Sequence, residues 1–449
     1  MKKSYDLIVV GSGSAGLTTA YDCRKAGWSV AVIDSMPFGG TCANRGCDPK
    51  KVLVGAGEVL DWAHRMRGLG IEGDIKIDWS KLMAFKNTFT KDRPKSTETG
   101  LASTGIDAYH GVAKFESEDT ITVGGSLLKA RYIMIASGAI PRPLGIDGDE
   151  YIIYSDDFLD MEELPEQIVF IGGGFISFEF AHVSVRAGSK VRILEHGKRP
   201  LKNFDEDMVK ILVQKSRDIG IKLHLETQVN SIEKSGDKLL VKGNRNDEEI
   251  SFECDLVVHG AGRIPSLHNM ALGKGNVVQN ERGVIVNEYL QSVSNPKVYA
   301  AGDVAATMGL PLTPVASMEA GIVSKNLLYG NQATANYKVV PSVVYSVPKV
   351  AFVGLSEKQA TDSGIDFEVK MIDTSSWYTS RRTNDGYSKI KTLVNKKDRL
   401  IVGAHAIGNA ADELINIFAM AIQFDISVDA IKEIIFAYPS VASDIHYML

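Results

Sequence analysis

Two stretches of the sequence repeat one pattern: an apolar strand, a glycine-rich turn, a helix and a second strand. Residues 5–34 contain the turn GSGSAG, and residues 168–195 contain the turn GGGFIS. A strand that passes through glycines into a helix and on to a parallel strand is the βαβ unit typical of dinucleotide-binding domains. The two copies predict an α/β chain with two Rossmann-like dinucleotide-binding domains, each built on a parallel sheet.

The length of 449 residues predicts about three domains, at roughly 150 residues per domain. Beyond Pro341 the pattern changes to strands mixed with helices, which predicts a C-terminal α+β domain. We therefore predict a first nucleotide domain over 1–145 and a second over 146–265. Residues 266–338 are predicted to return to the first domain and complete it, and 339–449 to form the third.

Composition excludes several classes of protein. The 50 basic and 55 acidic side chains give a net charge of −5, which does not favour nucleic-acid binding. No apolar run reaches the ~18 residues of a membrane span. The apolar stretch at the N-terminus is interrupted by Asp6 and is better interpreted as a strand than as a signal peptide. Four cysteines are too few for a secreted disulfide scaffold, so we expect a cytoplasmic protein.

The first glycine turn has Gly11, Gly13 and Gly16 in the G-x-G-x-x-G spacing. These glycines allow a tight turn, close approach of a pyrophosphate to backbone N–H groups, and close packing of helix on strand. Asp34 ends the next strand, where a carboxylate can accept hydrogen bonds from ribose hydroxyls. Strand, turn, helix and acid together predict a nucleotide site.

The second turn has Gly172, Gly173 and Gly174, with Ser177 as the small residue at the third position. Glu195 ends the following strand and is expected to bind an adenosine 2′-hydroxyl. A 2′-phosphate there would face a carboxylate, at a cost of about 1–4 kcal/mol for charges ~4 Å apart, which favours NADH over NADPH. The nearby Lys198, Arg199 and Lys202 could instead hold a phosphate.

Cys42 and Cys47 lie close together, with four residues between them. On an ideal helix their Cα atoms would be roughly 8–9 Å apart, whereas a disulfide needs less than about 7 Å. A bridge therefore needs a break in the helix, which Gly46 can supply. The alternatives are two independent cysteines or half of a metal site. No further Cys or His cluster completes four ligands, so no metal site is predicted.

Several separated motifs point to one family: GGTCANRGCDPK (39–50), ASG (136–138), GRIP (262–265), AAGDVA (301–306) and LTPVA (312–316). With these motifs the chain resembles the class I pyridine nucleotide–disulfide oxidoreductases, which include glutathione reductase, dihydrolipoamide dehydrogenase and mercuric reductase. The resemblance covers essentially the whole chain. It implies FAD in the first nucleotide domain, NADH or NADPH in the second, and a homodimer formed through the C-terminal dimerisation domain.

The resemblance also implies residue roles. Hydride would pass from the nicotinamide to FAD, and electrons would pass from FAD to a Cys42–Cys47 disulfide and then to a small-molecule acceptor. Cys47 would be the flavin-proximal thiol and Cys42 the interchange thiol. Lys50 would lie beside flavin N5 and pair with Glu179. The remaining positions implied for cofactor binding are Gly11, Gly13, Ser14, Ala15, Gly16, Asp34, Thr41, Val112, Ala136, Ser137, Gly138, Asp303, Thr313, Pro314 and Ala316, together with Gly172, Gly174, Phe175, Ile176, Glu195, Gly262 and Arg263.

The sequence departs from this family near its C-terminus. Disulfide-reducing members carry H-P-[ST]-x-x-E, whereas Tyr438 replaces the His here and Ser443 the Glu. A phenol with a pKa near 10 donates a proton but is a poor base, so disulfide turnover should fall by about 10²–10⁴-fold. His446 could substitute if the tail folds back; otherwise it is incidental. Asp48 is a second departure, because this family usually has an apolar residue at that position. A carboxylate beside Cys47 should disfavour its thiolate unless Arg45 or Lys50 offsets it.

Three functions remain open on the sequence. The leading hypothesis is an NAD(P)H-dependent flavoprotein disulfide reductase of glutathione-reductase type. The first alternative keeps the enzyme but makes a metal ion or a quinone the acceptor, neither of which needs the imidazole. The second is a flavin-bound redox sensor or complex subunit whose cysteines do not turn over.

Overall fold

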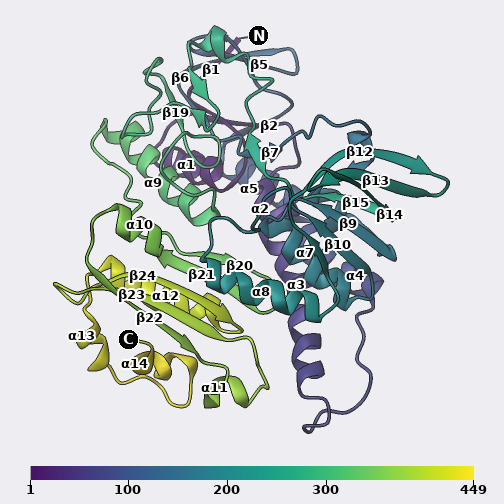
Figure 1. Cartoon of the computed structure of the whole chain (residues 1–449). Coiled ribbons are helices and arrows are strands. Elements are labelled where there is room, and N and C mark those ends of the chain that lie inside the picture. The colour runs from purple at the N-terminus through teal and green to yellow at the C-terminus, as the bar shows by residue number, and fades with distance from the viewer. Residues whose placement is uncertain (1) are drawn as a thin grey trace. The chain divides into compact units, whose positions relative to one another are not determined.

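The computed structural model describes residues 2–449, and the chain in it divides into two compact units (Figure 1). The first unit contains the N-terminal residues through Lys50, with 85–142 and 263–337. The second contains 51–84, 143–262 and 338–449. Residues 51–84 thus group with the second unit, whereas the sequence placed them in the first nucleotide domain. The domain boundaries themselves stay a prediction.

The first unit is built on a seven-stranded sheet in the order β3-β2-β1-β6-β5-β4, with β19 also paired to β6. Its strands β1 (Lys2–Val10), β2 (Val30–Asp34), β3 (Asp107–His110), β6 (Ser126–Ile135) and β19 (Val298–Ala300) pair in parallel. β4 (Lys114–Ser117) and β5 (Thr120–Val123) add antiparallel pairs. The apolar side chains of the central strands are buried, as in a sheet covered on both faces.

The strand order of this sheet reverses between β1 and β6, and the first glycine turn lies there. Gly11 follows β1 with a φ of +109°, and a Cβ on it would lie 2.2 Å from the carbonyl oxygen of Ala136, just after β6. Ligands of open α/β sheets bind outside the carboxyl ends of the strands at such a reversal. The fold therefore places the predicted nucleotide turn where a nucleotide site belongs.

The second unit holds a parallel sheet in the order β11-β10-β9-β15-β8. Its strands are β8 (Ile152–Ile153), β9 (Gln167–Ile171), β10 (Lys190–Leu194), β11 (Lys222–His224) and β15 (Leu256–His259). α7 (Phe175–Arg186) follows the second glycine turn, and α8 (Glu206–Asp218) follows β10. An antiparallel sheet of β12 (Thr227–Ser235), β13 (Lys238–Arg245) and β14 (Glu248–Cys254) completes this part. Both predicted parallel sheets are thus confirmed.

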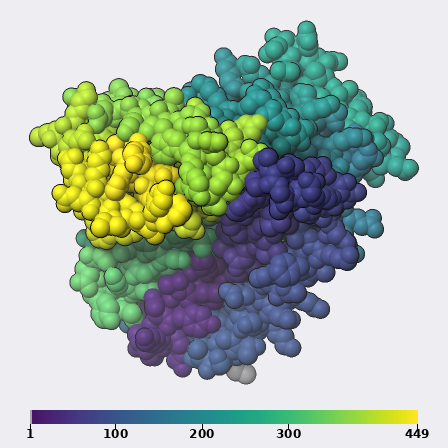
Figure 2. Space-filling model, turned by 90° about the horizontal axis from the view of Figure 1, so that it is seen from below, coloured from purple at the N-terminus to yellow at the C-terminus, as the bar shows by residue number. Residues whose placement is uncertain are grey.

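The C-terminal segment forms an antiparallel sheet in the order β20-β21-β24-β23-β22. Its strands are β20 (Ser342–Val344), β21 (Lys349–Gly354), β22 (Phe367–Asp373), β23 (Lys389–Asn395) and β24 (Ile401–Gly408). α12 (Ala411–Gln423) buries Leu414, Ile415 and Phe418 with apolar side chains of the sheet. Figure 2 shows this segment in yellow and yellow-green. Antiparallel strands with helices are the α+β arrangement that the sequence predicted.

The other helices and short strands have the following bounds: α1 (Ser14–Lys25), α2 (Gly40–Arg45), α3 (Cys47–Arg65), α4 (Trp79–Thr90), α5 (Arg93–Thr104), β7 (Ala139–Pro141), α6 (Ser155–Asp160), β16 (Arg263–Pro265), β17 (Gln279–Asn280), β18 (Gly283–Val284), α9 (Thr313–Tyr329), α10 (Glu357–Asp362), α11 (Tyr378–Arg381), α13 (Val428–Lys432) and α14 (Ile445–Met448). Across residues 2–449, none of the helices is both long and apolar enough to cross a membrane.

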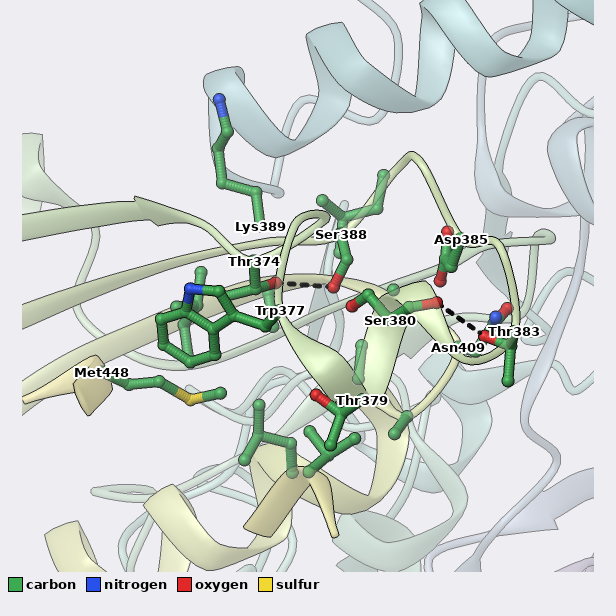
Figure 3. A pocket seen from close by; sticks show the side chains of 18 of the residues that line it. Thr374, Trp377, Thr379, Ser380, Thr383, Asp385, Ser388, Lys389, Asn409 and Met448 are labelled. Atoms are coloured by element: carbon green, nitrogen blue, oxygen red, sulfur yellow. Dashed lines mark hydrogen bonds between the residues drawn. The ribbon is translucent and has the colours of Figure 1, made fainter. Parts of the chain in front are cut away.

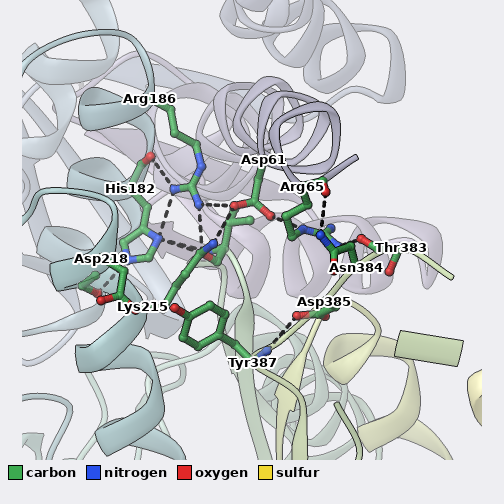
Figure 4. A network of polar contacts seen from close by, with 12 residues as sticks. Asp61, Arg65, His182, Arg186, Lys215, Asp218, Thr383, Asn384, Asp385 and Tyr387 are labelled. Carbon is green, nitrogen blue, oxygen red and sulfur yellow. Dashed lines mark hydrogen bonds and ion pairs between the residues drawn. The ribbon is translucent and has the colours of Figure 1, made fainter. Parts of the chain in front are cut away.

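A buried ion cluster joins three helices of the second unit (Figure 4). Asp61 of α3 binds Arg65 at 2.8 Å, Arg186 of α7 at 2.8 Å and Lys215 of α8 at 3.1 Å. The three cations hold the pKa of the Asp61 carboxyl far below its usual range, although burial opposes them. His182, beside Arg186, is fully buried, and burial lowers its pKa well below the usual value, so its ring is neutral. We name these five residues the ion cluster.

Candidate active site

The two cysteines of the first unit lie on either side of a break between helices. α2 ends at Arg45, Gly46 has φ −140° and ψ −113°, and α3 begins at Cys47. A Cβ on Gly46 would lie 2.9 Å from the carbonyl oxygen of Thr41 and 3.3 Å from Cα of Cys42. Only glycine fits there without a shift of the backbone. The predicted departure from a regular helix at Gly46 is therefore confirmed.

The two thiols hydrogen-bond to each other, which separates their pKa values. That bond is the largest influence that lowers the pKa of Cys47. A hydrogen bond with Thr313 and the charge of Lys50 also lower it, burial and the Asp48 carboxylate raise it, and the net pKa is about 6. The same bond, together with burial, raises the pKa of Cys42. Near neutral pH the pair therefore holds one proton, on Cys42, and Cys47 is a thiolate. The expected adverse effect of Asp48 is present but outweighed.

Thr313 touches the thiol pair from the start of α9. Its Oγ1 lies 3.7 Å from Sγ of Cys47, within hydrogen-bond range for sulfur, and Pro314 occupies the first turn of the helix. The sequence assigned Thr313 to the flavin only. Its contact with Cys47 joins residues 266 positions apart, so no local sequence pattern could have indicated it.

The residues of the first glycine turn fit the pyrophosphate of FAD. Gly13 precedes α1 without a side-chain cap, and a Cβ built on it would meet only Cα of Gly40, at 4.0 Å. The N–H groups of the first helical turn therefore face open space, where a phosphate is favoured. Asp34 is anchored next to this turn: it accepts hydrogen bonds from the N–H and hydroxyl of Ser12, at 2.7 and 2.6 Å, and from the N–H of Met36 at 2.9 Å.

Asp303 and Arg263 also belong to the first unit. Burial raises the pKa of Asp303, and the charge of Arg263 opposes that shift. The Arg263 guanidinium donates a hydrogen bond to the carbonyl of Ala139. The charge of Arg263 therefore acts on the Asp303 carboxyl, and the binding of a cofactor by either residue stays a prediction. Among the other predicted FAD residues, Ala15, Gly16 and Ala136 are buried and Val112 is exposed.

The second glycine turn has the same construction. Gly172 has a φ of +98°, and a Cβ on it would lie 2.5 Å from the carbonyl oxygen of Gly260. Gly174 precedes α7 without a side-chain cap, and Phe175 is half-exposed. A Cβ on Gly260 would lie 1.9 Å from Oγ of Ser177, so the small residue at that position serves close packing.

Glu195 is held by the backbone of two neighbouring loops. Its Oε2 accepts the N–H of Gly173 at 2.6 Å, and its Oε1 accepts the N–H of Gly197 at 2.7 Å. The side chain is 7% exposed, and the ammonium of Lys202 lies 3.8 Å from Oε1. A carboxylate is therefore fixed at the end of β10, where the sequence expects the adenosine ribose, with a cation beside it.

Lys50 and Glu179 were expected to pair. Glu179 of α7 is buried, and its Oε1 accepts the N–H of Tyr345 at 2.8 Å. Lys50 lies in the first unit and Glu179 in the second, and their pairing stays a prediction.

The C-terminal substitutions appear in the structure as follows. Tyr438 is 83% exposed, and Ser443 exchanges hydrogen bonds with Ser440 in a short helical turn. His446 bonds through Nε2 to the carbonyl of Ile434 at 3.0 Å, and its ring packs edge-on against Phe436. His446 is thus held within the C-terminal segment. Its substitution for the missing imidazole stays a prediction.

Among the described residues, one group of three side chains has the spacing of metal ligands: Asp205, Asp207 and Glu357. The ammonium of Lys391 lies 2.9, 2.6 and 2.6 Å from these three carboxylates. A buried lysine therefore occupies the space between the three carboxylates, and the arrangement is an ion pair network.

Comparisons with known proteins agree with this geometry. Residues 5–320 match the family described as pyridine nucleotide-disulphide oxidoreductase, and residues 340–449 match its dimerisation domain. A glutathione reductase of Burkholderia cepacia is 32% identical over 94% of this chain and 93% of its own length. A mercuric reductase of Staphylococcus aureus is 28% identical over 98% of this chain and 80% of its own.

Two further similarities concern a short protein and a solved structure. An uncharacterised 19.7 kDa protein in a mercuric resistance operon of Staphylococcus aureus is 56% identical over 40% of this chain and all of its own length. The Cu(II) complex of the HOCl-induced flavoprotein disulfide reductase RclA from Escherichia coli is 28% identical, covers 100% of this chain and 99% of its own, and has a TM-score of 0.89. The chain therefore belongs to the class I pyridine nucleotide–disulfide oxidoreductases, and it is an FAD-containing, NAD(P)H-dependent flavoprotein disulfide oxidoreductase with a dimerisation domain.

Proposed function

We propose that this enzyme transfers electrons from NADH through FAD and the Cys42–Cys47 pair to a small-molecule disulfide. The observation that carries the proposal is the pair of mutually hydrogen-bonded thiols at the break between α2 and α3, with Oγ1 of Thr313 3.7 Å from Sγ of Cys47. FAD, when bound, supplies the two-electron chemistry that connects a pyridine nucleotide to a disulfide. Lys50 and Glu179 would provide a cation and its counter-ion near the ring.

The proposed exchange is balanced within the thiol pair. Two electrons and one proton convert the Cys42–Cys47 disulfide to the Cys42 thiol and the Cys47 thiolate, and the second thiolate released from the acceptor takes its proton from the solvent. Cys42, once deprotonated, attacks the acceptor disulfide, forms a mixed disulfide and expels one thiolate, which takes up a proton. The Cys47 thiolate then attacks Cys42 and expels the second thiolate. The sum is NADH, one proton and a disulfide going to NAD⁺ and two thiols.

A metal-ion acceptor is the second candidate, and Tyr438 is the observation that favours it. Disulfide exchange needs a base for Cys42 and an acid for the leaving thiolate, and a phenol serves as the base poorly. Two thiolates bind soft metal ions directly. The reduced pair can pass two electrons to one Hg(II) or to two Cu(II) ions and reform its disulfide without protonating a leaving thiolate. The mercuric reductase relative and the Cu(II) complex of RclA support testing both metals.

The preference for NADH rests on Glu195. Its carboxylate is held by the N–H groups of Gly173 and Gly197, and in the proposed complex it would face the adenosine 2′-group. A 2′-phosphate would meet this negative charge, although Lys202 reduces the penalty. We expect kcat/KM to be higher for NADH than for NADPH, and Glu195→Gln to reduce the difference.

We also propose a homodimer formed through residues 340–449, which match the dimerisation domain. The low cysteine count supports a cytoplasmic location.

The central experiment is an anaerobic titration of the FAD-loaded enzyme with NADH, followed by absorbance at long wavelength. A band typical of a thiolate beside the oxidised flavin should appear in the wild type after two electrons. In Cys42→Ser, which has no disulfide to reduce, the band should be present before NADH is added, and in Cys47→Ser it should be absent. A band that persists in Cys47→Ser contradicts the assignment of the proximal thiol. Steady-state assays with oxidised glutathione, lipoamide, Hg(II), Cu(II) and a quinone then identify the acceptor. Reduction without multiple turnovers on any of them contradicts the enzymatic proposal and supports a redox sensor.

A further inference from the structure

The C-terminal part of the second unit contains a cavity of about 230 Å³ (Figure 3). It is lined mainly by residues 374–390, by the end of β24 and the start of α12. None of its lining residues belongs to the thiol pair or to either glycine turn. The volume is below the ~300–1,000 Å³ usual for drug-sized ligands, so the cavity suits a small molecule.

One end of the cavity is polar, and three of its polar groups lack partners among the described residues, whereas the Thr383 hydroxyl donates to the carbonyl of Ser380. Figure 3 shows Ser380, Thr383, Asp385 and Asn409 gathered there. Ser380 and Asp385 are only 8% and 6% exposed. Asp385 Oδ1 accepts the N–H of Tyr387 at 3.1 Å. Within residues 2–449, its Oδ2, the Ser380 hydroxyl and the Asn409 side-chain amide have no hydrogen bond, and no cation pairs with Asp385. None of these three groups is among the fully buried side-chain atoms without a partner in the described residues, so they face the open space of the cavity, where a bound molecule can donate hydrogen bonds to them.

The other end of the cavity is apolar and aromatic. Figure 3 shows Trp377 and Met448 on that side, and Leu414 and Val441 also line the cavity. The indole of Trp377 is fixed by an edge-on contact with Tyr447 at 6.1 Å. An indole face attracts a cation or packs against an apolar group, and a thioether adapts to either.

Two basic residues line the cavity, and neither neutralises Asp385. Lys389 lies 4.0 Å from Asp373, and in Figure 3 its ammonium points away from the other labelled side chains. Arg382 is exposed to solvent, where salt screens its charge. The buried charge of the cavity is therefore the Asp385 carboxylate.

We propose that this cavity binds a small organic ammonium ion with an apolar tail. The ammonium group would donate hydrogen bonds to Asp385 and to the oxygens of Ser380 and Asn409. The tail would lie against Trp377 and Met448. An anion would meet the buried carboxylate, and an alcohol would leave its charge without a counter-ion. This site is separate from the redox chemistry and does not depend on the identity of the electron acceptor.

The test compares three probes that share a phenyl tail: phenethylammonium, 2-phenylethanol and 3-phenylpropionate. Each is titrated into the full-length, FAD-loaded enzyme, with binding measured by calorimetry and by saturation-transfer NMR. A hydrogen bond to a charged group predicts that phenethylammonium binds roughly ten- to a hundredfold more tightly than the alcohol, with the carboxylate weakest. Equal affinities for amine and alcohol, or no binding of the amine, overturn the proposal.

Two variants locate the binding. Asp385→Asn keeps an acceptor for the Tyr387 N–H and should bring the affinities for amine and alcohol to within a few-fold of each other. Ser380→Ala removes a hydroxyl without a protein partner, leaves the fold intact, and should weaken the amine by about fivefold. Asp366→Asn is the matched control, because Asp366 pairs at the surface with Lys396. If amine binding is the same in both cavity variants as in Asp366→Asn, the proposed site is wrong.

Discussion

The thiol pair and the ion cluster both lower the pKa of an acidic group, but for opposite purposes. Cys47 keeps a pKa of about 6, because a hydrogen bond from Cys42 stabilises its thiolate while burial and Asp48 oppose it. Asp61 is surrounded by three cations and is 7% exposed, and the pKa of its carboxyl lies far below the range of neutral solution. A group that must lose a proton or form a bond during the reaction has a pKa near neutral pH. A group that only joins helices is kept charged at every working pH.

The largest effect should follow from removing the reactive sulfur. Cys47→Ser leaves no thiolate to resolve a mixed disulfide with Cys42, so turnover should fall by at least ~10³-fold. The fall in turnover is measured by a steady-state assay with oxidised glutathione. Cys254→Ser, which changes a buried cysteine at the end of β14 in the second unit, is the control and should retain activity. Substantial turnover in Cys47→Ser would contradict the claim that the Cys47 thiolate resolves the mixed disulfide.

Removing the central charge of the ion cluster should affect stability. Asp61→Asn leaves Arg186 and Lys215 buried without their counter-ion, which should lower the free energy of unfolding by roughly 3–5 kcal/mol in urea denaturation of the holoenzyme. Because the folded pKa of Asp61 is lowered, its contribution is complete above the unfolded value near 3.9 and decreases as the pH falls below it. The difference between wild type and variant should therefore shrink in acid.

A matched surface pair provides the control for Asp61. Glu206 on α8 pairs with Lys210 at 3.0 Å, and both side chains are exposed. Glu206→Gln should leave the denaturation midpoint nearly unchanged. If Asp61→Asn behaves in the same way, the ion cluster does not hold the helices together.

Adding an imidazole should raise disulfide turnover. Tyr438→His supplies a base whose pKa is near neutrality, and kcat/KM for oxidised glutathione should increase by up to about 10²-fold. Tyr438→Phe is the matched control; it should change this value little, because the phenol is a poor base. An unchanged value for Tyr438→His would mean that the missing imidazole does not limit the reaction.

The smallest effects concern the position of the Cys47 titration. In the reduced enzyme the ultraviolet absorbance of the thiolate should titrate with a midpoint at about pH 6. Asp48→Asn should move the midpoint down because a negative charge is removed, and Thr313→Val should move it up because a hydrogen bond to the thiolate is lost. Shifts in the same direction for both variants would contradict this account of the site.

Much of the architecture could be predicted from local patterns. The order of strand, glycine turn and helix predicted both parallel sheets, and the change of pattern after Pro341 predicted the α+β segment. The distance between Cys42 and Cys47 on an ideal helix predicted the break at Gly46. Each of these predictions depends on steric limits within a few residues. The pairing of Lys50 with Glu179 needs two distant segments and stays a prediction.

The sequence by itself determined where the chain must turn, because a glycine such as Gly11 or Gly46 has no Cβ to clash with the backbone opposite. Only the tertiary structure decided that Thr313 meets Cys47, that Asp61 gathers cations from two other helices, and that Asp385 opens into a cavity with Ser380 and Asn409. These contacts join segments far apart in the sequence. They form only when whole helices and strands pack together, so no local pattern predicts them.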